Sequence, residues 1–250
     1  DKKTLFTYVM RLADDQLILG HRLSEWCGKA PTLEEELAQA NLALDLIGQA
    51  RELFTYAGEI EGKGRDEDAL AYMRYEQDYS NALLLERPNG DFAVTTVRHL
   101  AYSAFMLPFW KKLMGSSDET LAAIAAKSAK ETEYHLRHSA EWTIRLGDGT
   151  DESRARIIEA MDDLWAYTGE LFEMDDVAQA MAEAGIGVDA AALKPEWDAT
   201  IDQVLAEATL ERPAEGYMQT GGRSGRHTEH MGHILCELQY MQRAYPGMTW

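Results

Sequence analysis

The chain has 250 residues, and 43 Asp and Glu against 24 Lys and Arg give it a formal net charge of −19, while 46% of its residues are apolar. The apolar share is enough for a folded core, which excludes a disordered acidic scaffold. The acid surplus argues against a protein that coats nucleic acid or docks on an anionic membrane, because both partners attract clustered Lys and Arg. It raises the hypothesis that some carboxylates are metal ligands or act as acid and base.

No membrane segment or secretory signal is expected. The longest apolar stretch, Ala101–Trp110, is about half of the roughly 20 residues that a membrane-spanning helix needs. Asp1–Lys3 leads directly into an amphipathic segment without an apolar signal region. Cys27 and Cys236 lie far apart in the sequence and lack a C-x-x-C pattern, so we expect two reduced thiols in a cytoplasmic protein rather than one disulfide.

Composition and turn signals predict an all-α fold. Prolines are few, Ala, Leu and Glu are abundant, and capping boxes are expected at Thr32 with Glu35 and at Ser116 with Glu119. Helices are predicted at 3–27, 32–60, 66–85, 91–113, 116–147, 152–169, 174–184, 196–211 and 228–243. Long helices joined by short turns are typical of a bundle, and without repeats or linkers we expect a single domain over residues 1–250.

Polar residues interrupt the apolar stripes of four long predicted helices near mid-length. In chain order they are Gln16, Gln49, His99, Ser103, Thr132, His135 and Ser139. A polar group in a core costs about 1–3 kcal/mol unless it finds a hydrogen-bond partner, so we expect these residues to meet one another. Amides, hydroxyls and imidazoles provide no buried carboxylate to balance two iron ions. We therefore predict a neutral hydrogen-bonded network rather than a metal centre.

Five short motifs along the chain are specific when taken together and in order. They are Ala30–Leu33 (APTL), Leu44–Arg51 (LDLIGQAR), Tyr134–Arg137 (YHLR), Arg145–Thr150 (RLGDGT) and His227–His230 (HTEH). These motifs resemble those of the C subunit of the phenylacetyl-CoA monooxygenase (epoxidase) complex, and the similarity covers essentially the whole chain. The resemblance implies a ferritin-like helical bundle with additional C-terminal helices.

The resemblance extends to the diiron A subunit of the same complex, which provides a comparison for the ligand positions. There, a similar Ala-Pro-Thr-Leu turn leads to an Asp-Glu-Ala-Gly-His string whose Glu and His bind iron, and Leu46 and Gln49 stand at those places here. A Lys-Glu-Glu-x-Phe-His string provides another pair, of which this chain keeps His135 but has Thr132 in place of Glu. By the same comparison, the remaining two carboxylate positions are occupied here by Gln16 and Ser103.

The resemblance therefore implies a non-catalytic subunit without a metal or cofactor of its own. Its expected partners are the homologous diiron subunit and other subunits of the oxygenase complex, and a homodimer is left open. The complex is expected to epoxidise the aromatic ring of phenylacetyl-CoA in aerobic phenylacetate degradation. On this interpretation nearly all of the acidic surplus lies on the solvated surface.

A histidine cluster near the C-terminus supports the alternative hypothesis of a stand-alone ferritin-like metalloenzyme. His227, His230 and His233 are spaced three residues apart, with Glu229 between them, and neutral imidazoles on one helix can share a zinc ion. Steps of three drift around a helix, however, so the outer two histidines lie about 120° apart. A histidine bonded to a backbone carbonyl is therefore the preferred interpretation.

The same alternative enzyme could use His135, which lies three residues before His138 and near Glu131 and Glu141. This cluster is the weaker candidate, because His138 points away from the stripe that contains His135. No G-x-S-x-G elbow or comparable nucleophile arrangement is found, so no catalytic residue is assigned to this chain.

A glycine-rich loop, Gly221–Arg226, places two arginines before the last predicted helix. It lacks the G-x-x-x-x-G-K-[ST] pattern of a phosphate loop, and no strand precedes it, so nucleotide binding is not expected. In an acidic chain this local positive patch is the best candidate for a docking element, and a flexible connector is the alternative. The partner-binding candidates are Arg223, Arg226, His227, Glu229 and His230.

Overall fold

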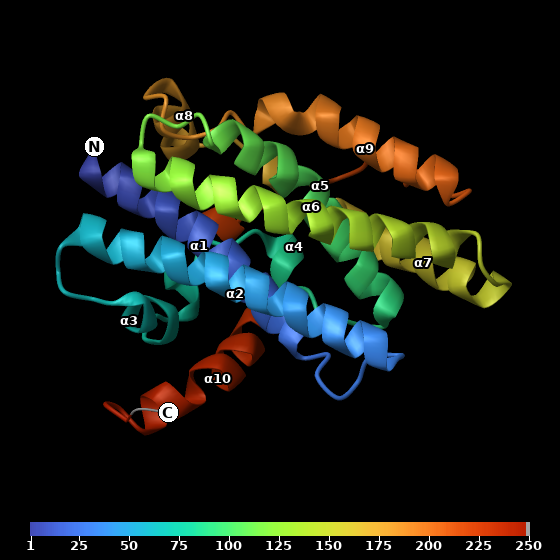
Figure 1. The fold of residues 1–250 in the computed structure, drawn as a ribbon, viewed down its shortest axis with the longest axis horizontal. Helices are drawn as coiled ribbons and strands as arrows, with labels where there is room; N and C mark the ends of the chain where they lie inside the picture. The colour runs from blue at the N-terminus through green and yellow to red at the C-terminus, as the bar shows by residue number, and fades with distance from the viewer. Residues whose placement is uncertain (249–250) are drawn as a thin grey trace. The chain divides into compact units, whose positions relative to one another are not determined.

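The computed structural model describes residues 1–248, and within them it contains ten α-helices and no β-strand (Figure 1). The predicted all-α class is confirmed. Contacts between residues divide the chain into two compact units, Asp1–Pro88 with Thr220–Trp250, and Asn89–Gln219. The single domain expected over residues 1–250 stays a prediction. Within the described range, none of the helices has the length and apolar character to cross a membrane.

The first unit is built on two long antiparallel helices, α1 (Lys2–Ser24) and α2 (Leu33–Glu61), which lie side by side (Figure 1). Thr32 caps α2 as predicted, because its hydroxyl accepts a hydrogen bond from the N–H of Glu35 at 3.3 Å. Gly20 lets the helices approach closely, since a Cβ atom there would lie 3.2 Å from the Cβ of Leu46.

The segment after α2 differs from the single helix predicted at 66–85, which is wrong. It contains α3 (Glu67–Tyr72), a 3₁₀ turn (Glu76–Asp78) and α4 (Leu83–Glu86). Two carboxylates of α1 bind backbone groups of the intervening chain: Ser80 N–H donates to Asp14 at 2.9 Å, and Ala82 N–H donates to Asp15 at 2.8 Å. Because these donors bond outside the segment, they cannot complete the i→i−4 pattern of a continuous helix.

The first unit also includes the C-terminal helix α10 (Glu229–Ala244), which packs against α1, α3 and α4. The glycine-rich loop before it is a packed element rather than a flexible connector. A Cβ atom added at Gly222 would overlap the carbonyl oxygen of Asn81, and one added at Gly225 would overlap that of Gln77. Gly225 also has a positive φ of 75°, which glycine adopts readily.

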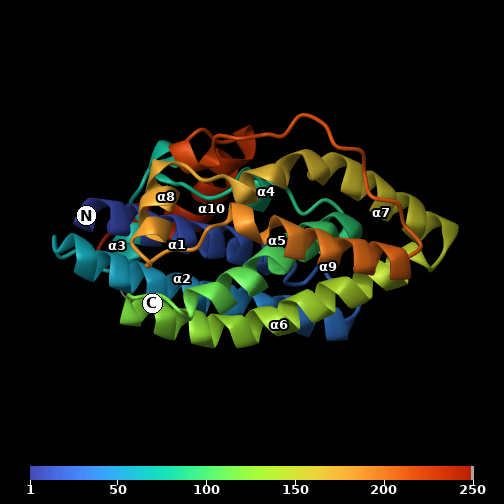
Figure 2. The ribbon, with the colours of Figure 1, turned by 90° about the horizontal axis from the view of Figure 1, so that it is seen from above.

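The second unit contains the other pair of long antiparallel helices, α5 (Phe92–Leu113) and α6 (Glu119–Gly147). Three shorter helices complete it: α7 (Asp151–Leu164), α8 (Asp176–Glu183) and α9 (Lys194–Glu207). Figure 2 shows α9 along α5 and α6, and the indole N–H of Trp197 in α9 donates to the carbonyl of Ala101 in α5 at 2.9 Å. These helices match the predicted ones to within a few residues, except that α7 stops at Leu164 and 3₁₀ turns follow it.

The capping box expected at Ser116 and Glu119 is also wrong. Asp118 caps α6 instead, because its carboxylate accepts from the N–H of Leu121 at 3.0 Å. The hydroxyl of Ser116 donates to the carbonyl of Ile186 at 2.7 Å, which ties the start of α6 to the chain that follows α8.

Candidate functional site

All six positions that the resemblance compares with iron ligands are buried. The exposed fractions are 1% for Gln16, 2% for Leu46, 1% for Gln49, 2% for Ser103, 3% for Thr132 and 2% for His135. The inward orientation expected from the apolar stripes is therefore confirmed. That these residues occupy former ligand positions stays a prediction.

In the first unit, these positions lie on α1 and α2. Leu46 lies against Gly20 of α1, so an aliphatic side chain fills the space at a position where the diiron relative is expected to have a ligand. Gln16 and Gln49 are buried amides, which carry no formal charge at any ordinary pH. The compared positions of the first unit therefore offer amide groups and hydrocarbon.

In the second unit, polar residues of α5 and α6 contact one another, which confirms one part of the network predicted across four helices. The hydroxyls of Ser103 and Ser139 lie 3.2 Å apart, and each has a carbonyl of its own helix within hydrogen-bond distance, that of His99 (2.6 Å) and that of His135 (2.9 Å). The rings of His99 and His135 are 5.2 Å apart between centroids. Hydroxyls and imidazoles thus form a buried polar cluster between two helices.

This cluster is uncharged at His99. Burial, and then the nearby His135, His138 and Arg98, lower the pKa of His99 well below its usual value, so its imidazole is neutral at pH 7. Neither ring nitrogen of His99 has a hydrogen-bond partner in residues 1–248.

The six compared positions do not fit a diiron centre. They offer two amides, two hydroxyls, one imidazole and one hydrocarbon side chain, and none is a carboxylate. Paired iron ions in a ferritin-like bundle are held mainly by glutamates, whose negative charge balances that of the metal. Six side chains without a carboxylate cannot supply this balance, and no iron chemistry is assigned to these residues.

The first unit contains a buried feature that the sequence pattern did not reveal. Asp14, Asp15 and Glu86 are at most 1% exposed, so they are exceptions to the expectation that nearly all carboxylates are solvated. Arg74 forms a two-pronged ion pair with Asp14, and Arg223 binds Asp15 through two contacts of 2.9 and 2.8 Å. Each carboxylate has a cationic partner, as a buried charge requires.

The third buried carboxylate, Glu86, binds His227. The Nδ1 atom of His227 lies 2.7 Å from Glu86, and its Nε2 atom lies 3.0 Å from the carbonyl of Tyr79. Burial alone lowers the pKa of His227, but its hydrogen bond and charge pairing with Glu86 outweigh burial and raise that pKa. A ring with acceptors at both nitrogens is best satisfied as the imidazolium, so His227 is poorly suited to binding a metal.

These contacts separate the predicted docking residues into two groups. Arg223 and His227 are bound within the chain, with side chains only 18% and 4% exposed. Arg226 and Glu229 are exposed, and His230 is partly exposed with its Nε2 atom 3.9 Å from Glu229. The docking role of the set stays a prediction, and only the second group offers side chains to another molecule.

Neither predicted histidine cluster forms a compact metal-ligand group. In residues 1–248, only one set of three or more His, Cys, Asp or Glu side chains has its ligand atoms within 4.8 Å of one another, and it consists of His21, Glu25 and Glu237. The i, i+4 spacing of His21 and Glu25 is visible in the sequence, but Glu237 belongs to a different helix. Cys27 and Cys236 are exposed free thiols, as expected.

The fold is that of an all-α protein of the ferritin-like class. None of the six buried positions compared with iron ligands carries a carboxylate. The chain belongs to the family described as Phenylacetic acid catabolic protein, which matches residues 1–250. It is 48% identical to the C subunit of the 1,2-phenylacetyl-CoA epoxidase of Escherichia coli (strain K12), over 246 residues that cover 98% of this chain and 99% of that protein. The resemblance inferred from the motifs is confirmed.

Proposed function

We propose that this chain is a non-catalytic subunit of a multicomponent oxygenase that epoxidises the aromatic ring of phenylacetyl-CoA, and that it binds and supports a homologous diiron subunit. The observation that carries the proposal is the lack of any carboxylate at the six buried compared positions. Similarity to an epoxidase subunit supplies the reaction. A chain in this family without a diiron ligand set can contribute by binding a partner that has one. The two free thiols favour a cytoplasmic complex.

An exposed apolar face on α2 supports the partner-binding part of the proposal. Leu33, Leu37, Leu44 and Ile47 are 71%, 59%, 65% and 39% exposed, and their spacings of four, seven and three place them along one side of the helix. Contiguous exposed apolar side chains are typical of protein–protein contacts. We assign this α2 face to the contact with the diiron subunit.

The exposed residues after the glycine-rich loop form a second proposed contact. A partner can contact the side chains of Arg226, Glu229 and His230. Such a contact leaves the internal ion pairs of Arg223 and His227 intact. A charge reversal at Arg223 would instead disturb the buried Asp15, so it cannot report on docking alone. The informative substitution in this loop is Arg226→Glu.

Co-expression with the diiron subunit tests the proposal. The isolated chain is expected to purify with far less than one iron ion per molecule and without activity, and the co-expressed pair is expected to elute together and epoxidise phenylacetyl-CoA. Leu37→Glu with Leu44→Glu should weaken co-elution, since it places charge on the proposed contact face, and Arg226→Glu should weaken it less. Glu207→Lys, on the exposed end of α9, is the control.

Two results would contradict the proposal. Close to two iron ions per isolated chain, with diiron absorption, would show that the chain is itself a metalloenzyme. Full activity of the diiron subunit alone would show that this chain is not needed. Unchanged co-elution of the α2 double variant would contradict only the assignment of the α2 face.

A further inference from the structure

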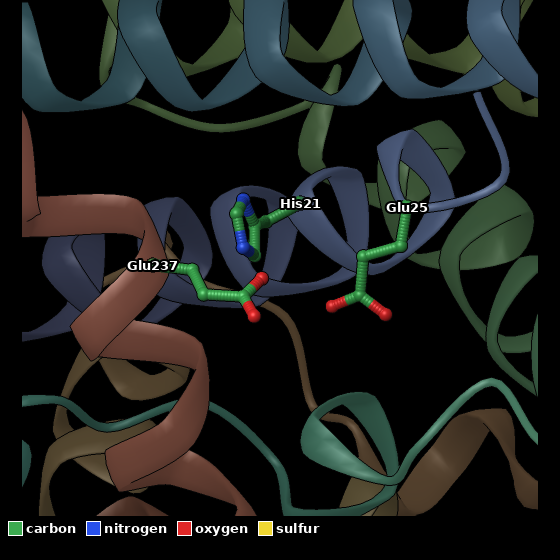
Figure 3. Close-up of side chains that lie close together, drawn as sticks. All are labelled: His21, Glu25 and Glu237. Carbon is green, nitrogen blue, oxygen red and sulfur yellow. The ribbon is translucent and has the colours of Figure 1, made fainter. Parts of the chain in front are cut away.

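His21, Glu25 and Glu237 form a cluster where the end of α1 meets α10, within the first unit (Figure 3). Figure 3 shows the carboxylate of Glu237 next to the imidazole of His21, and the carboxylate of Glu25 across from that of Glu237. One ligand atom of each residue lies within 4.8 Å of those of the other two. We propose that these three side chains bind one divalent transition-metal ion of the Zn²⁺ type. This site is separate from the six compared positions and does not depend on the proposed function.

The donor set fits such an ion. Zn²⁺ binds imidazole nitrogen and carboxylate oxygen, and sites with three protein ligands keep an open position for water. The two carboxylates of Glu25 and Glu237 balance the charge of a divalent cation. Glu237 is exposed and His21 and Glu25 are partly buried, so an ion can enter from the solvent side of α10.

The imidazole of His21 gives a second reason for a ligand at this place. Its Nε2 atom is buried and has no hydrogen-bond partner in residues 1–248. A buried polar atom without a partner is unfavourable, and a metal ion would satisfy it.

Binding requires a small rearrangement. Zinc bonds to nitrogen and oxygen are about 2.0–2.2 Å long, so ligand atoms that lie up to 4.8 Å apart must approach by as much as roughly 1 Å. The exposed side chain of Glu237 can make this movement by a change of rotamer. Arg22 binds one oxygen of Glu25 at 2.8 Å, and a carboxylate can present its other oxygen to a metal. The bound ion would cross-link α1 and α10.

Titration of the full chain with ZnSO₄, followed by calorimetry, tests the site. Wild-type protein is expected to bind one ion per chain, and His21→Ala and Glu237→Gln are each expected to weaken binding by about tenfold or more. Glu237→Gln changes an exposed side chain, so its effect is not due to unfolding. Zn²⁺ should also raise the Tm of the wild type more than that of either variant, because the ion joins two helices of the folded state.

His233→Ala is the matched control. His233 is exposed and lies one turn from Glu237 on α10, so this pair could chelate zinc without α1. The proposal expects His233→Ala to bind zinc like the wild type. It is overturned by no binding, by binding that persists in both His21→Ala and Glu237→Gln, or by binding that is lost in His233→Ala and retained in His21→Ala.

Discussion

Two buried polar regions, one in each unit, differ in the kind of group that they bury. The first unit buries full charges, and Asp14 with Arg74 and Asp15 with Arg223 are ion pairs inside it. Between α5 and α6, the second unit buries hydroxyls, such as that of Ser103, and the neutral imidazole of His99. The contrast teaches that burial alone does not reveal what a polar residue contributes.

The energetics of the two arrangements differ in kind. A buried ion pair contributes little over a well-packed apolar core, but the loss of one partner leaves a charge in a medium that cannot solvate it. A hydroxyl bonded to a carbonyl of its own helix can be removed without leaving a charge behind. Substitutions should therefore be far more harmful in the charged interior than in the neutral one.

The largest effect is expected for Arg74→Ala. This substitution leaves Asp14, which is fully buried, without its two-pronged partner, and it removes the stacking of the guanidinium 3.9 Å from the ring of Tyr79. We expect the free energy of unfolding to fall by about 3–5 kcal/mol, measured by urea denaturation.

Arg51→Ala is the matched control for Arg74→Ala. Arg51 also pairs with a carboxylate, that of Glu67 at 3.2 Å, but its side chain is 73% exposed. We expect a loss of about 0.5 kcal/mol or less, because water replaces an exposed pair at little cost. Similar losses in the two variants would contradict the distinction between buried and exposed charge.

A smaller and pH-dependent effect is expected for His227→Ala. The wild-type imidazolium binds Glu86, which is fully buried, so its loss should cost about 1.5–3 kcal/mol at about pH 6. Pairing with Glu86 outweighs burial and raises the pKa of His227 in the folded state, so the proton stabilises the fold. This contribution is complete below the unfolded pKa and is lost as the pH rises through the folded one.

The measurement for His227→Ala is urea denaturation at a series of pH values upward from about pH 6. Wild-type stability should fall over this range by more than that of the variant, so the two curves should converge. His233→Ala, which changes an exposed histidine of α10, should keep the wild-type slope. Parallel curves for the wild type and His227→Ala would show that the Glu86 pair is not charged.

The parts of the fold that could be predicted from the sequence are those with local causes. The expected helix at 91–113 is observed as Phe92–Leu113, because its periodicity and its flanking turns lie in the segment itself. The apolar stripes also predicted the burial of Gln16 and Gln49, since period and neighbouring apolar residues decide which face points inward.

The parts that could not be predicted depend on residues far away in the chain. Within the expected helix at 66–85, the backbone N–H groups of Ser80 and Ala82 bond to Asp14 and Asp15 of α1 instead of to the segment itself. In the same way, the ion pair of Arg223 with Asp15 joins residues far apart in the chain. The sequence around Arg223 does not indicate this partner, so the sequence predicted a docking role for Arg223 instead. The neutral cluster of α5 and α6 was predictable because all its residues fall on two stripes, whereas the ion pairs follow no period.

The smallest effect is expected for Ser103→Ala in the neutral cluster. The hydroxyl of Ser103 donates to the carbonyl of His99 at 2.6 Å, and Ser139 keeps its own bond to the carbonyl of His135 at 2.9 Å when Ser103 is changed. We expect a loss of about 1 kcal/mol or less by urea denaturation. Ser128→Ala is the control, because the Ser128 hydroxyl is buried in α6 without a hydrogen-bond partner in residues 1–248, and its removal should leave stability unchanged or raise it. A loss for Ser103→Ala as large as that for Arg74→Ala would show that the neutral cluster is as important to stability as the buried ion pairs, and the contrast between the two buried regions would fail.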